Sequence, residues 1–179
     1  MTLALKRPEL ASVADFAQLF ADHAPFVLRV LQHLGIPRSD VQDQAQEVFV
    51  AVHKGLSSFG GRSSVRTWIY GICVYVASNH RRRAYVRRER AVAEPPEAVD
   101  LQAQEAFEQD QRWPALQRLL DTLDPDKREV FVLYELEELS MREVAEACGC
   151  PLQTAYSRLH AARRLLLERY REQELKDER

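Results

Sequence analysis

Apolar residues recur every three or four positions along most of this chain, and that spacing restricts the chain to a fold of packed helices. The first run lasts from Phe16 to Leu34, includes Phe20 on its inward side, and stops at "GIP", residues 35–37. No segment shows the alternation of apolar and polar residues that a half-buried strand requires. The sequence therefore predicts an all-α protein.

Two further helices are predicted before residue 90. One begins near Ser39, and its inward side is formed by apolar residues: Val41, Ala45, Val48, Phe49, Val52 and Leu56. The segment "SFGGRSS", residues 58–64, contains two glycines and three serines, which is typical of a loop. The next helix follows this loop, and its inner residues are Val65, Trp68, Ile69, Ile72 and Val76.

Residues 91–110 differ in composition from the rest of the chain. They contain two adjacent prolines and no lysine or arginine, and their carboxylates are Glu94, Glu97, Asp100, Glu105, Glu108 and Asp110. Low hydrophobicity with a single sign of charge favours a linker over a core element. The predicted organisation is an N-terminal tail (1–12), a helical domain (13–90), an acidic linker (91–112) and a second small helical domain (113–175).

The second domain carries the pattern of a helix-turn-helix. Asp124 and the proline after it are suited to the N-cap and first turn of one helix. Ser140 and Glu143 form a capping box that would begin a short helix, and Gly149 would end it in the left-handed conformation. A longer helix is predicted from about Pro151. A short helix, a glycine turn and a longer helix are typical of DNA-binding helix-turn-helix units.

The longer helix has an apolar side and a polar side. Its inward stripe is Leu152, Ala155, Leu159, Ala162 and Leu166. The opposite face falls to Gln153, Thr154, Ser157, His160, Ala161 and Arg164, flanked by Tyr156, Arg158 and Arg163. Hydroxyl, amide and guanidinium groups suit base edges and phosphates in the major groove. An ordinary solvated helix face has a similar pattern, and the capping box and glycine turn favour DNA.

A local basic segment follows the predicted aromatic helix, although the whole chain has a formal net charge of -2. Its arginines are Arg81, Arg82, Arg83, Arg87, Arg88 and Arg90, and Arg62 and Arg66 extend the patch towards the loop. A phosphate backbone is the natural partner of such a patch. Phe59, Tyr70 and Tyr75 are rings that can stack on unpaired bases. The alternative is a solvated helix end, with Trp68 in the core.

No metal or cofactor is predicted. Cys73, Cys148 and Cys150 make an odd count without the paired spacing of a zinc site or a disulfide framework. A C-x-C pair completed by His160 is therefore a weaker interpretation than buried small side chains.

One helix face presents three carboxylates, Asp40, Asp43 and Glu47. Taken alone, they suit a carboxylate metal site or a general acid and base. No histidine at the usual spacing of bundle metal sites accompanies them. An enzyme built on these groups stays an alternative.

The N-terminal stretch "MTLALKRPELASVADF" lacks the long apolar run and cleavage site of a secretory signal. No apolar run approaches the roughly 18 residues of a membrane span. We therefore expect a protein of the cytoplasm, where an odd number of reduced cysteines is ordinary.

Two ordered blocks of sequence resemble the extracytoplasmic-function (ECF) sigma factors, the small promoter-recognition subunits of bacterial RNA polymerase. The first block is "SDVQDQAQEVFVAVHKGLSSFGGRSSVRTWIYGI", and the second is "LDTLDPDKREVFVLYELEELSMREVAEACGCPLQTAYSRLHAARRLL". The similarity extends from about Asp15 to Leu167. It implies a non-enzymatic subunit that binds core polymerase, recognises promoters and opens the DNA strands.

The resemblance assigns roles to individual positions. The family's D-x-x-Q-E-x-F block docks on the clamp helices of the beta-prime subunit, which implies core-polymerase contacts at Asp40, Asp43, Gln46, Glu47 and Phe49. The loop "SFGGRSS" and the helix after it match the segment that captures and melts the minus-ten element. The residues implied there are Phe59, Arg62, Ser63, Ser64, Arg66, Thr67, Tyr70, Tyr75, Arg81 and Arg82.

The longer C-terminal helix matches the reader of the minus-thirty-five element. The residues implied are Gln153, Thr154, Tyr156, Ser157, Arg158, His160 and Arg164. Tyr75, Gln153 and Tyr156 depart from residues common in the family, so a different promoter sequence is expected.

The resemblance also implies partners. These are the beta and beta-prime subunits of core polymerase, promoter DNA and an anti-sigma protein, and the family's linker enters the polymerase cleft. The main competing interpretation is a stand-alone helix-turn-helix regulator that binds duplex operators.

Overall fold

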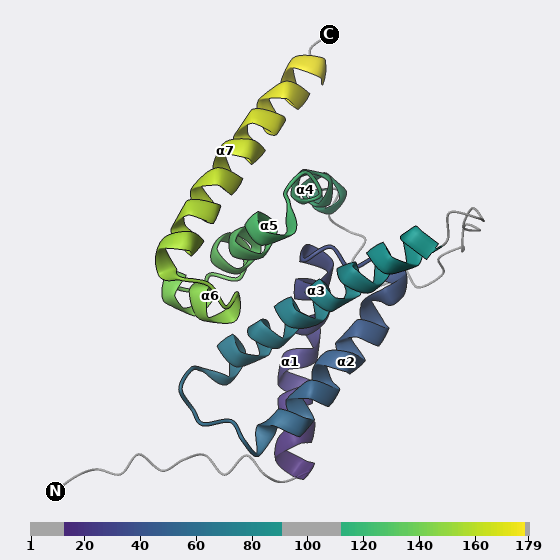
Figure 1. The fold of residues 1–179 in the computed structure, drawn as a ribbon, viewed down its shortest axis with the longest axis vertical. Helices are drawn as coiled ribbons and strands as arrows, with labels where there is room; N and C mark the ends of the chain where they lie inside the picture. Colours follow the sequence, from purple (N-terminus) through teal and green to yellow (C-terminus); the bar gives the residue numbers. More distant parts are fainter. Residues whose placement is uncertain (1–12, 91–111, 178–179) are drawn as a thin grey trace, which may run out of the picture.

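The computed structural model describes residues 13–90 and 112–177, and every regular element in these ranges is helical (Figure 1). The elements are α1 (Val13–His33), α2 (Arg38–Leu56), α3 (Val65–Arg90), α4 (Arg112–Leu120), α5 (Pro125–Phe131), η1 (Val132–Leu136), α6 (Met141–Ala147) and α7 (Leu152–Asp177). The predicted all-α fold is confirmed. The acidic stretch from 91 to 110 lies outside the described residues.

Helices α1, α2 and α3 pack against one another and form the N-terminal unit (Figure 1). Its core is apolar, and fully buried members are Val27, Val30, Leu31, Val48, Val52 and Ile69. Gly35 ends the first helix with φ +92, a left-handed conformation that glycine adopts without strain. The break predicted at "GIP" therefore lies where α1 turns into α2.

One inward assignment in α1 is wrong. Phe20 is 47% exposed and lies at the rim of the bundle, with its ring centroid 4.5 Å from that of Phe49. The residue before it, Leu19, is buried in the core. Phe20 points about 100° away from Leu19 around the helix axis, and at this position that direction leads out of the core.

Helices α4 to α7 form the C-terminal unit. Its buried residues include Leu120, Val130, Val132, Leu133, Val144, Ala155, Leu159 and Ala162. The Asp124 side chain accepts a hydrogen bond from the backbone N–H of Lys127 and caps α5, as predicted. The sequence pattern does not predict that α5 continues into a π-helical segment, η1. Such segments often occur at functional positions.

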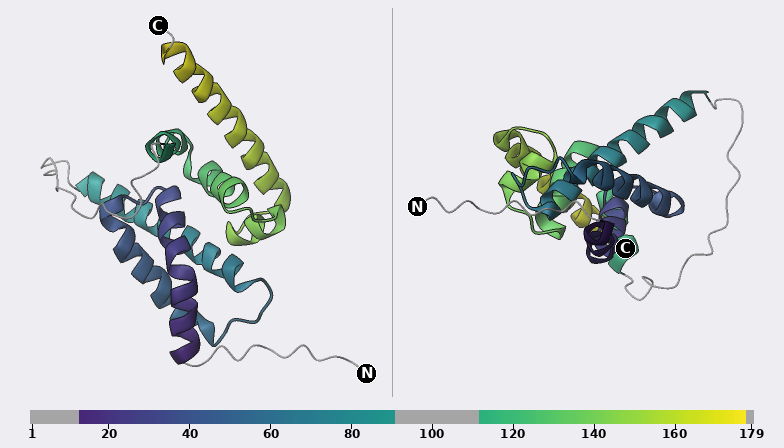
Figure 2. Two further views of the ribbon diagram at one scale, coloured as in Figure 1. Left: turned by 180° about the vertical axis from the view of Figure 1, so that it is seen from behind. Right: turned by 90° about the horizontal axis from the view of Figure 1, so that it is seen from below.

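The predicted helix-turn-helix is present in α6 and α7. Both hydrogen bonds of the capping box between Ser140 and Glu143 are formed, and Gly149 has φ +61 in the turn. The second half of α7 projects away from the other helices, as Figure 1 and the left view of Figure 2 show. Leu152, assigned to the inward stripe, is 40% exposed. Side chains lean towards a helix N-terminus, so this first residue projects past the end of α7.

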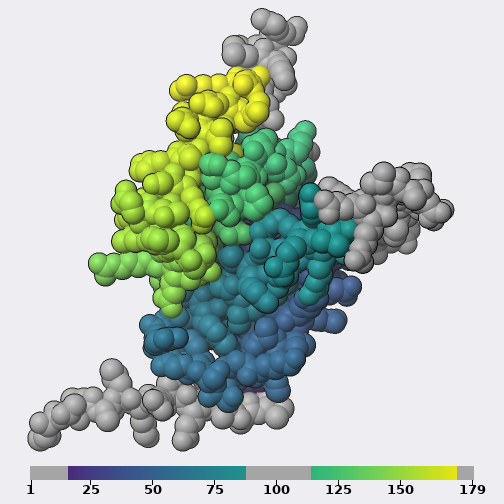
Figure 3. Space-filling model, viewed as in Figure 1, coloured from purple at the N-terminus to yellow at the C-terminus, as the bar shows by residue number. Residues whose placement is uncertain are grey.

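The two units are in direct contact, because α6 packs against α3. Figure 3 shows the C-terminal unit seated on the upper surface of the N-terminal unit. The sequence pattern does not predict this contact.

Within residues 13–90 and 112–177, no helix is long and apolar enough to cross a membrane. Cys73 is buried, Cys148 and Cys150 are half-buried, and all three are free thiols. Burial is the main cause that raises the pKa of Cys148 to about 12, so this thiol is unreactive.

Candidate nucleic-acid interface

The loop at residues 58–64 is anchored by two stacked rings. The centroids of Phe59 and Trp68 are 4.8 Å apart with an interplanar angle of 30°. Trp68 in turn lies over Gly55, where an added Cβ would come within 2.7 Å of the indole. Phe59 is half-buried, whereas Arg62 at the loop tip is exposed. Phe59 therefore shapes the loop, and Arg62 is the side chain that the loop presents.

Ser64 caps the start of α3. Its hydroxyl oxygen accepts a hydrogen bond from the backbone N–H of Thr67 at 3.0 Å and lies 2.8 Å from the Thr67 hydroxyl. Thr67 is buried, and its hydroxyl donates to Glu143 Oε1 at 3.0 Å. Glu143 is the capping-box residue of α6. Thr67, expected at the minus-ten surface, is therefore covered by the C-terminal unit.

Tyr70 is completely buried. Its hydroxyl donates to Glu137 Oε2 at 2.7 Å and accepts from Arg66 Nε and Nη2 at 3.2 and 3.0 Å. Burial and the bond to Glu137 raise the Tyr70 pKa. This ring cannot stack on a base while the two units are in contact. The Arg66 side chain stays 53% exposed.

Glu137 is the centre of a charged cluster between the units. Arg29 binds both carboxylate oxygens, with Nε 3.2 Å from Oε1 and Nη2 2.9 Å from Oε2. His33 Nδ1 lies 3.6 Å from Oε1. Burial would raise the Glu137 pKa, but His33, Arg29 and Tyr70 together lower it to about 2. Glu137 is therefore ionised over the whole physiological range. We call Arg29, His33, Arg66, Tyr70 and Glu137 the Glu137 cluster.

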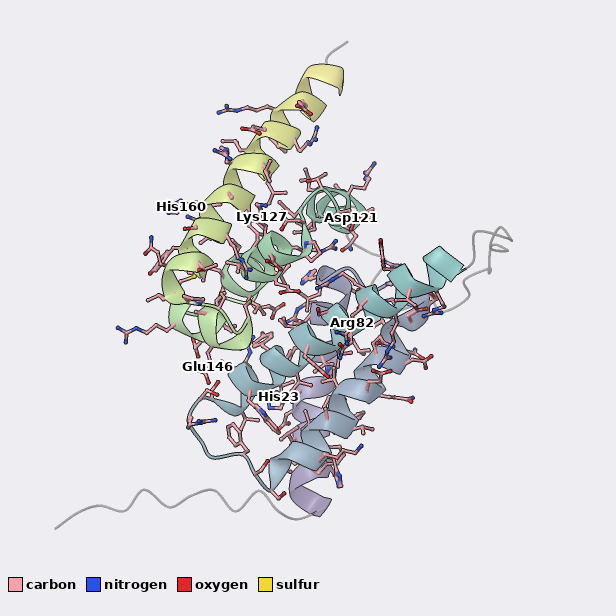
Figure 4. The ribbon with its side chains drawn as sticks, in the orientation of Figure 1. His23, Arg82, Asp121, Lys127, Glu146 and His160 are labelled. Carbon is pink, nitrogen blue, oxygen red and sulfur yellow. The ribbon has the colours of Figure 1, made fainter. Side chains whose placement is uncertain are left out.

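The remaining minus-ten candidates on α3 differ in exposure. Tyr75 is 64% exposed, and Arg82 is exposed with a 2.9 Å hydrogen bond to Asn79. Figure 4 shows Arg82 on α3. Arg81 instead binds Glu129 of α5, with Nη2 2.5 Å from Oε1. Ser63 is half-buried.

A groove of about 780 Å³ runs between α3 and the α5, α6 and α7 side of the C-terminal unit. Tyr75, Arg82 and Tyr85 line it on one side, and Asp126, Glu146 and Arg158 line it on the other.

The predicted reading face of α7 is open to solvent. Its exposed members are Gln153, Tyr156, Ser157, His160 and Arg164, and Thr154 and Arg158 are half-buried. Ser157 Oγ donates to the Gln153 carbonyl at 2.9 Å, and Arg158 pairs with Asp126 of α5. Figure 4 shows His160 on the side of α7 that faces away from α5.

Two carboxylates of α2, those of Asp40 and Glu47, are held in ion pairs with α3. Asp40 Oδ2 is 2.8 Å from His80 Nε2, and Glu47 Oε1 is 2.8 Å from Arg83 Nη1. The hydrogen bond from His80 lowers the Asp40 pKa. The sequence spacing placed no histidine near these carboxylates at the positions usual for bundle metal sites. Helix packing nevertheless brings His80, 40 positions away, to Asp40. Even so, no group of three metal-binding side chains occurs among the described residues.

The other residues of the docking block have different environments. Asp43 and Gln46 are exposed, whereas Phe49 is 5% exposed and belongs to the core.

Sequence patterns also missed Arg128. This arginine is 7% exposed, donates from Nε to the His33 carbonyl at 2.5 Å, and donates from Nη1 to Asp121 at 2.7 Å. A guanidinium at a helix C-terminus is favoured by the helix dipole. Arg128 and His33 are 95 positions apart, so no local pattern reveals this contact.

The comparisons with known proteins all indicate one family. Residues 19–87 match the model of Sigma-70 region 2, and residues 114–166 match the model of Sigma-70, region 4. The chain is 34% identical over 142 residues to an ECF RNA polymerase sigma-E factor of Haemophilus influenzae, covering 73% of this chain and 75% of the relative. It is 30% identical over 138 residues to the sigma-E factor of Escherichia coli K12, covering 72% of each.

Two solved structures are similar in fold. CnrH in complex with the cytosolic domain of CnrY has a TM-score of 0.66 and 25% identity, covering 90% of each chain. The sigma factor RpoE from Bartonella quintana, in complex with the anti-sigma factor NepR, has a TM-score of 0.65 and 22% identity, covering 87% of this chain and 96% of that one. The chain thus belongs to the extracytoplasmic-function family of RNA polymerase sigma factors, which act in transcription initiation.

Proposed function

We propose that three separate surfaces of this chain divide the work of initiation. The exposed face of α7 reads the minus-thirty-five element, the loop at 58–64 with the start of α3 captures the minus-ten element, and α2 docks on core polymerase. We assign residues 13–90 to sigma region 2, 91–112 to the linker and 113–175 to sigma region 4. The family-model matches lie within these ranges. Sigma factors are non-enzymatic, so the carboxylate enzyme is set aside.

The observation that carries the proposal is the open face of α7. It follows a capping box and a left-handed glycine, and its polar residues are exposed while the opposite side is buried. An α-helix presented in this way fits the major groove, where amide, hydroxyl and guanidinium groups reach base edges and phosphates. Arg164 would contact phosphate, whereas Gln153 and Tyr156 would face bases.

At the minus-ten element, Arg62 and Tyr75 are the exposed side chains best suited to unpaired DNA. A guanidinium can bind phosphate or stack on a base, and a tyrosine ring can stack. Phe59 supports the loop because its ring stacks on that of Trp68. Thr67 and Tyr70 can take part only after the C-terminal unit has moved away from α3.

Docking on core polymerase would use the exposed part of α2. Asp43, Gln46 and Glu47 present polar groups there, whereas buried Phe49 holds the helix to the core. The ion pair between Glu47 and Arg83 is exposed, so its loss would cost little free energy.

An anti-sigma protein is the third proposed partner. Both similar structures are complexes, one with the anti-sigma factor NepR and the other with the cytosolic domain of CnrY. We place the chain in the cytoplasm, where core polymerase and the genome are found.

The test is transcription by purified core polymerase on a randomised promoter library, with the transcripts sequenced. The chain is expected to select a two-part promoter. Arg164→Ala should weaken selection of the upstream part, whereas Arg169→Ala, which removes an exposed arginine paired with Glu172 further along α7, should leave it unchanged. Tight binding to duplex promoters without polymerase, with no transcripts above core alone, would instead establish the stand-alone regulator.

A further inference from the structure

We infer that Gly55 is a positioning residue for the loop at 58–64, and that it acts through packing rather than through contact with DNA. Its missing side chain makes room for the indole of Trp68, and this ring holds the start of the loop. The ring thereby sets where Arg62 is presented. The inference rests on the proposed role of the loop at the minus-ten element.

Gly55 lies in the last turn of α2, where a glycine weakens the helix relative to alanine. A left-handed backbone does not explain its presence, because the described glycines with positive φ are Gly35, Gly61 and Gly149. The space around it does explain it. An added Cβ would lie 2.7 Å from Cζ2 and 3.4 Å from Cη2 of Trp68, and the first distance is well inside van der Waals contact. The indole therefore occupies the volume that any other side chain would fill.

The backbone of Gly55 also anchors the start of the loop, which joins α2 to α3 (Figure 1). Its carbonyl accepts hydrogen bonds from the backbone N–H of Ser58 at 3.1 Å and from the Ser58 hydroxyl at 2.9 Å. The next backbone N–H, that of Phe59, donates to the Leu56 carbonyl at 3.2 Å. The first two residues of the loop are thus bonded to the turn of α2 that seats the indole.

Trp68 connects the two ends of the loop. Its backbone N–H donates to the carbonyl of Ser64, the last residue of the loop, at 3.0 Å. Its ring lies beside that of Phe59, with centroids 4.8 Å apart and an interplanar angle of 30°. Its outer ring atoms face Gly55. One residue therefore contacts the end of α2 and both ends of the loop.

The tip of the loop projects into open space. Gly60, Gly61 and Arg62 are exposed, and an added Cβ on either glycine would meet no atom within 4 Å beyond its chain neighbours. The position of Arg62 is therefore set mainly by the fixed ends of the loop. A hydrogen bond weakens steeply outside a narrow range of distance and angle, so a small displacement of these ends is enough to lose a contact between the guanidinium and DNA.

The experiment is a double-mutant cycle in the full-length chain. Gly55→Ala adds the methyl group that meets the indole, and Trp68→Phe removes the two ring atoms that it meets. The double variant therefore carries the methyl group without the clash. Lys54→Ala is the matched control, because Lys54 is an exposed residue in the same turn of α2.

Two of the measurements need no polymerase. The fluorescence emission of Trp68 is recorded in chains that also carry Trp113→Phe, since the sequence contains two tryptophans. Hydrogen exchange reports protection of residues 57–64. Permanganate footprinting with core polymerase then measures opening of the minus-ten region, and fluorescence anisotropy measures binding of a duplex fragment that holds only the minus-thirty-five element.

Gly55→Ala should shift the Trp68 emission and speed hydrogen exchange in residues 57–64. It should reduce opening by about fivefold or more, the smallest loss expected for one base contact, and leave binding of the duplex fragment unchanged. In the Trp68→Phe background, the same alanine should change exchange and opening by less than about twofold. The control should match the parent.

Equal losses from the alanine in both backgrounds, or parent-like exchange in Gly55→Ala, overturn the inference. Failure of the double variant to fold when Trp68→Phe folds does the same, because no clash is then left to explain it. Normal opening by a Gly55→Ala chain whose loop exchange is raised overturns the proposed role of the loop instead.

Discussion

The hydroxyl of Tyr70 donates a 2.7 Å hydrogen bond to Glu137, which lies 67 positions further along the chain. This bond joins α3, which we propose takes part in strand opening, to the unit that contains the helix-turn-helix. The carboxylate of Glu137 is ionised because its interactions with Arg29, His33 and Tyr70 outweigh the cost of burial. A side chain that was expected to bind DNA, Tyr70, thus holds the two units together in this structure.

The first prediction concerns pH and the Glu137→Gln variant. The pKa of Glu137 is lowered from 4.5 to about 2, so its ionised form stabilises the fold fully above pH 4.5, and this contribution is lost as the pH falls towards 2. Glu137 faces groups on both neighbouring helices: Arg29, His33, Arg66, Tyr70 and Cys73. The variant should be less stable than the parent by about 3 kcal/mol at pH 7. Urea unfolding at several pH values measures this difference, which should shrink below pH 4.5. A difference that stays constant down to pH 2.5 would contradict the role of this charge.

The second prediction is that Glu47→Lys weakens association with core polymerase, because it reverses a charge on the proposed docking face of α2. Co-purification with core polymerase measures the loss. Arg83→Ala is the control, because it breaks the same ion pair while leaving the Glu47 carboxylate in place. If both variants lose binding equally, the ion pair itself rather than the docking carboxylate is required.

The third prediction concerns promoter reading by Tyr156 and Ser157. Replacing each residue by alanine should reduce transcription from promoters that depend on the minus-thirty-five element. If a good base contact is lost, the free energy of promoter binding should weaken by about 1 to 3 kcal/mol. Tyr156→Ala should have the larger effect, because the Ser157 hydroxyl already donates to the Gln153 carbonyl. Tyr156→Phe separates the ring from the hydroxyl. Equal activity of the alanine variants on all upstream sequences would show that α7 does not read bases.

The fourth prediction concerns strand opening by the loop at 58–64. Arg62→Ala should impair open-complex formation more than initial duplex binding, because losing a base contact costs about 1 to 3 kcal/mol. Permanganate footprinting of the minus-ten region measures opening. A promoter with a mismatched bubble at that element should rescue the variant in part, because melting then costs no free energy. Normal opening of the fully paired promoter would exclude a role for Arg62 in melting.

Phe59→Ala should give a similar opening defect for a different reason. Its ring stacks on Trp68, so the variant should loosen the loop. Increased hydrogen exchange in residues 57–64 is expected for Phe59→Ala and not for Arg62→Ala. The same exchange rates in both variants would show that Phe59 does not anchor the loop.

The local features of this protein were predictable from its sequence. Helical spacing, the Asp124 cap, the Ser140–Glu143 capping box and the left-handed Gly149 all depend on residues within a few positions of one another. The open face of α7 follows from the same periodicity. The predicted boundaries of the helices therefore agree closely with those observed, apart from the π-helical segment at 132–136.

Only the tertiary structure decided which candidate residues are accessible. Tyr70 and Tyr75 lie in the same helix, five positions apart, yet Tyr70 is fully buried and Tyr75 is 64% exposed. The difference arises because Tyr70 lies on the side of α3 that packs against Phe26 of α1 and against the C-terminal unit. His80 reaches Asp40, and Arg29 reaches Glu137, across 40 and 108 positions. Sequence periodicity specifies which face of a helix is apolar, but the partner of a polar group depends on how the helices pack, and these contacts are too distant in sequence to leave a local pattern.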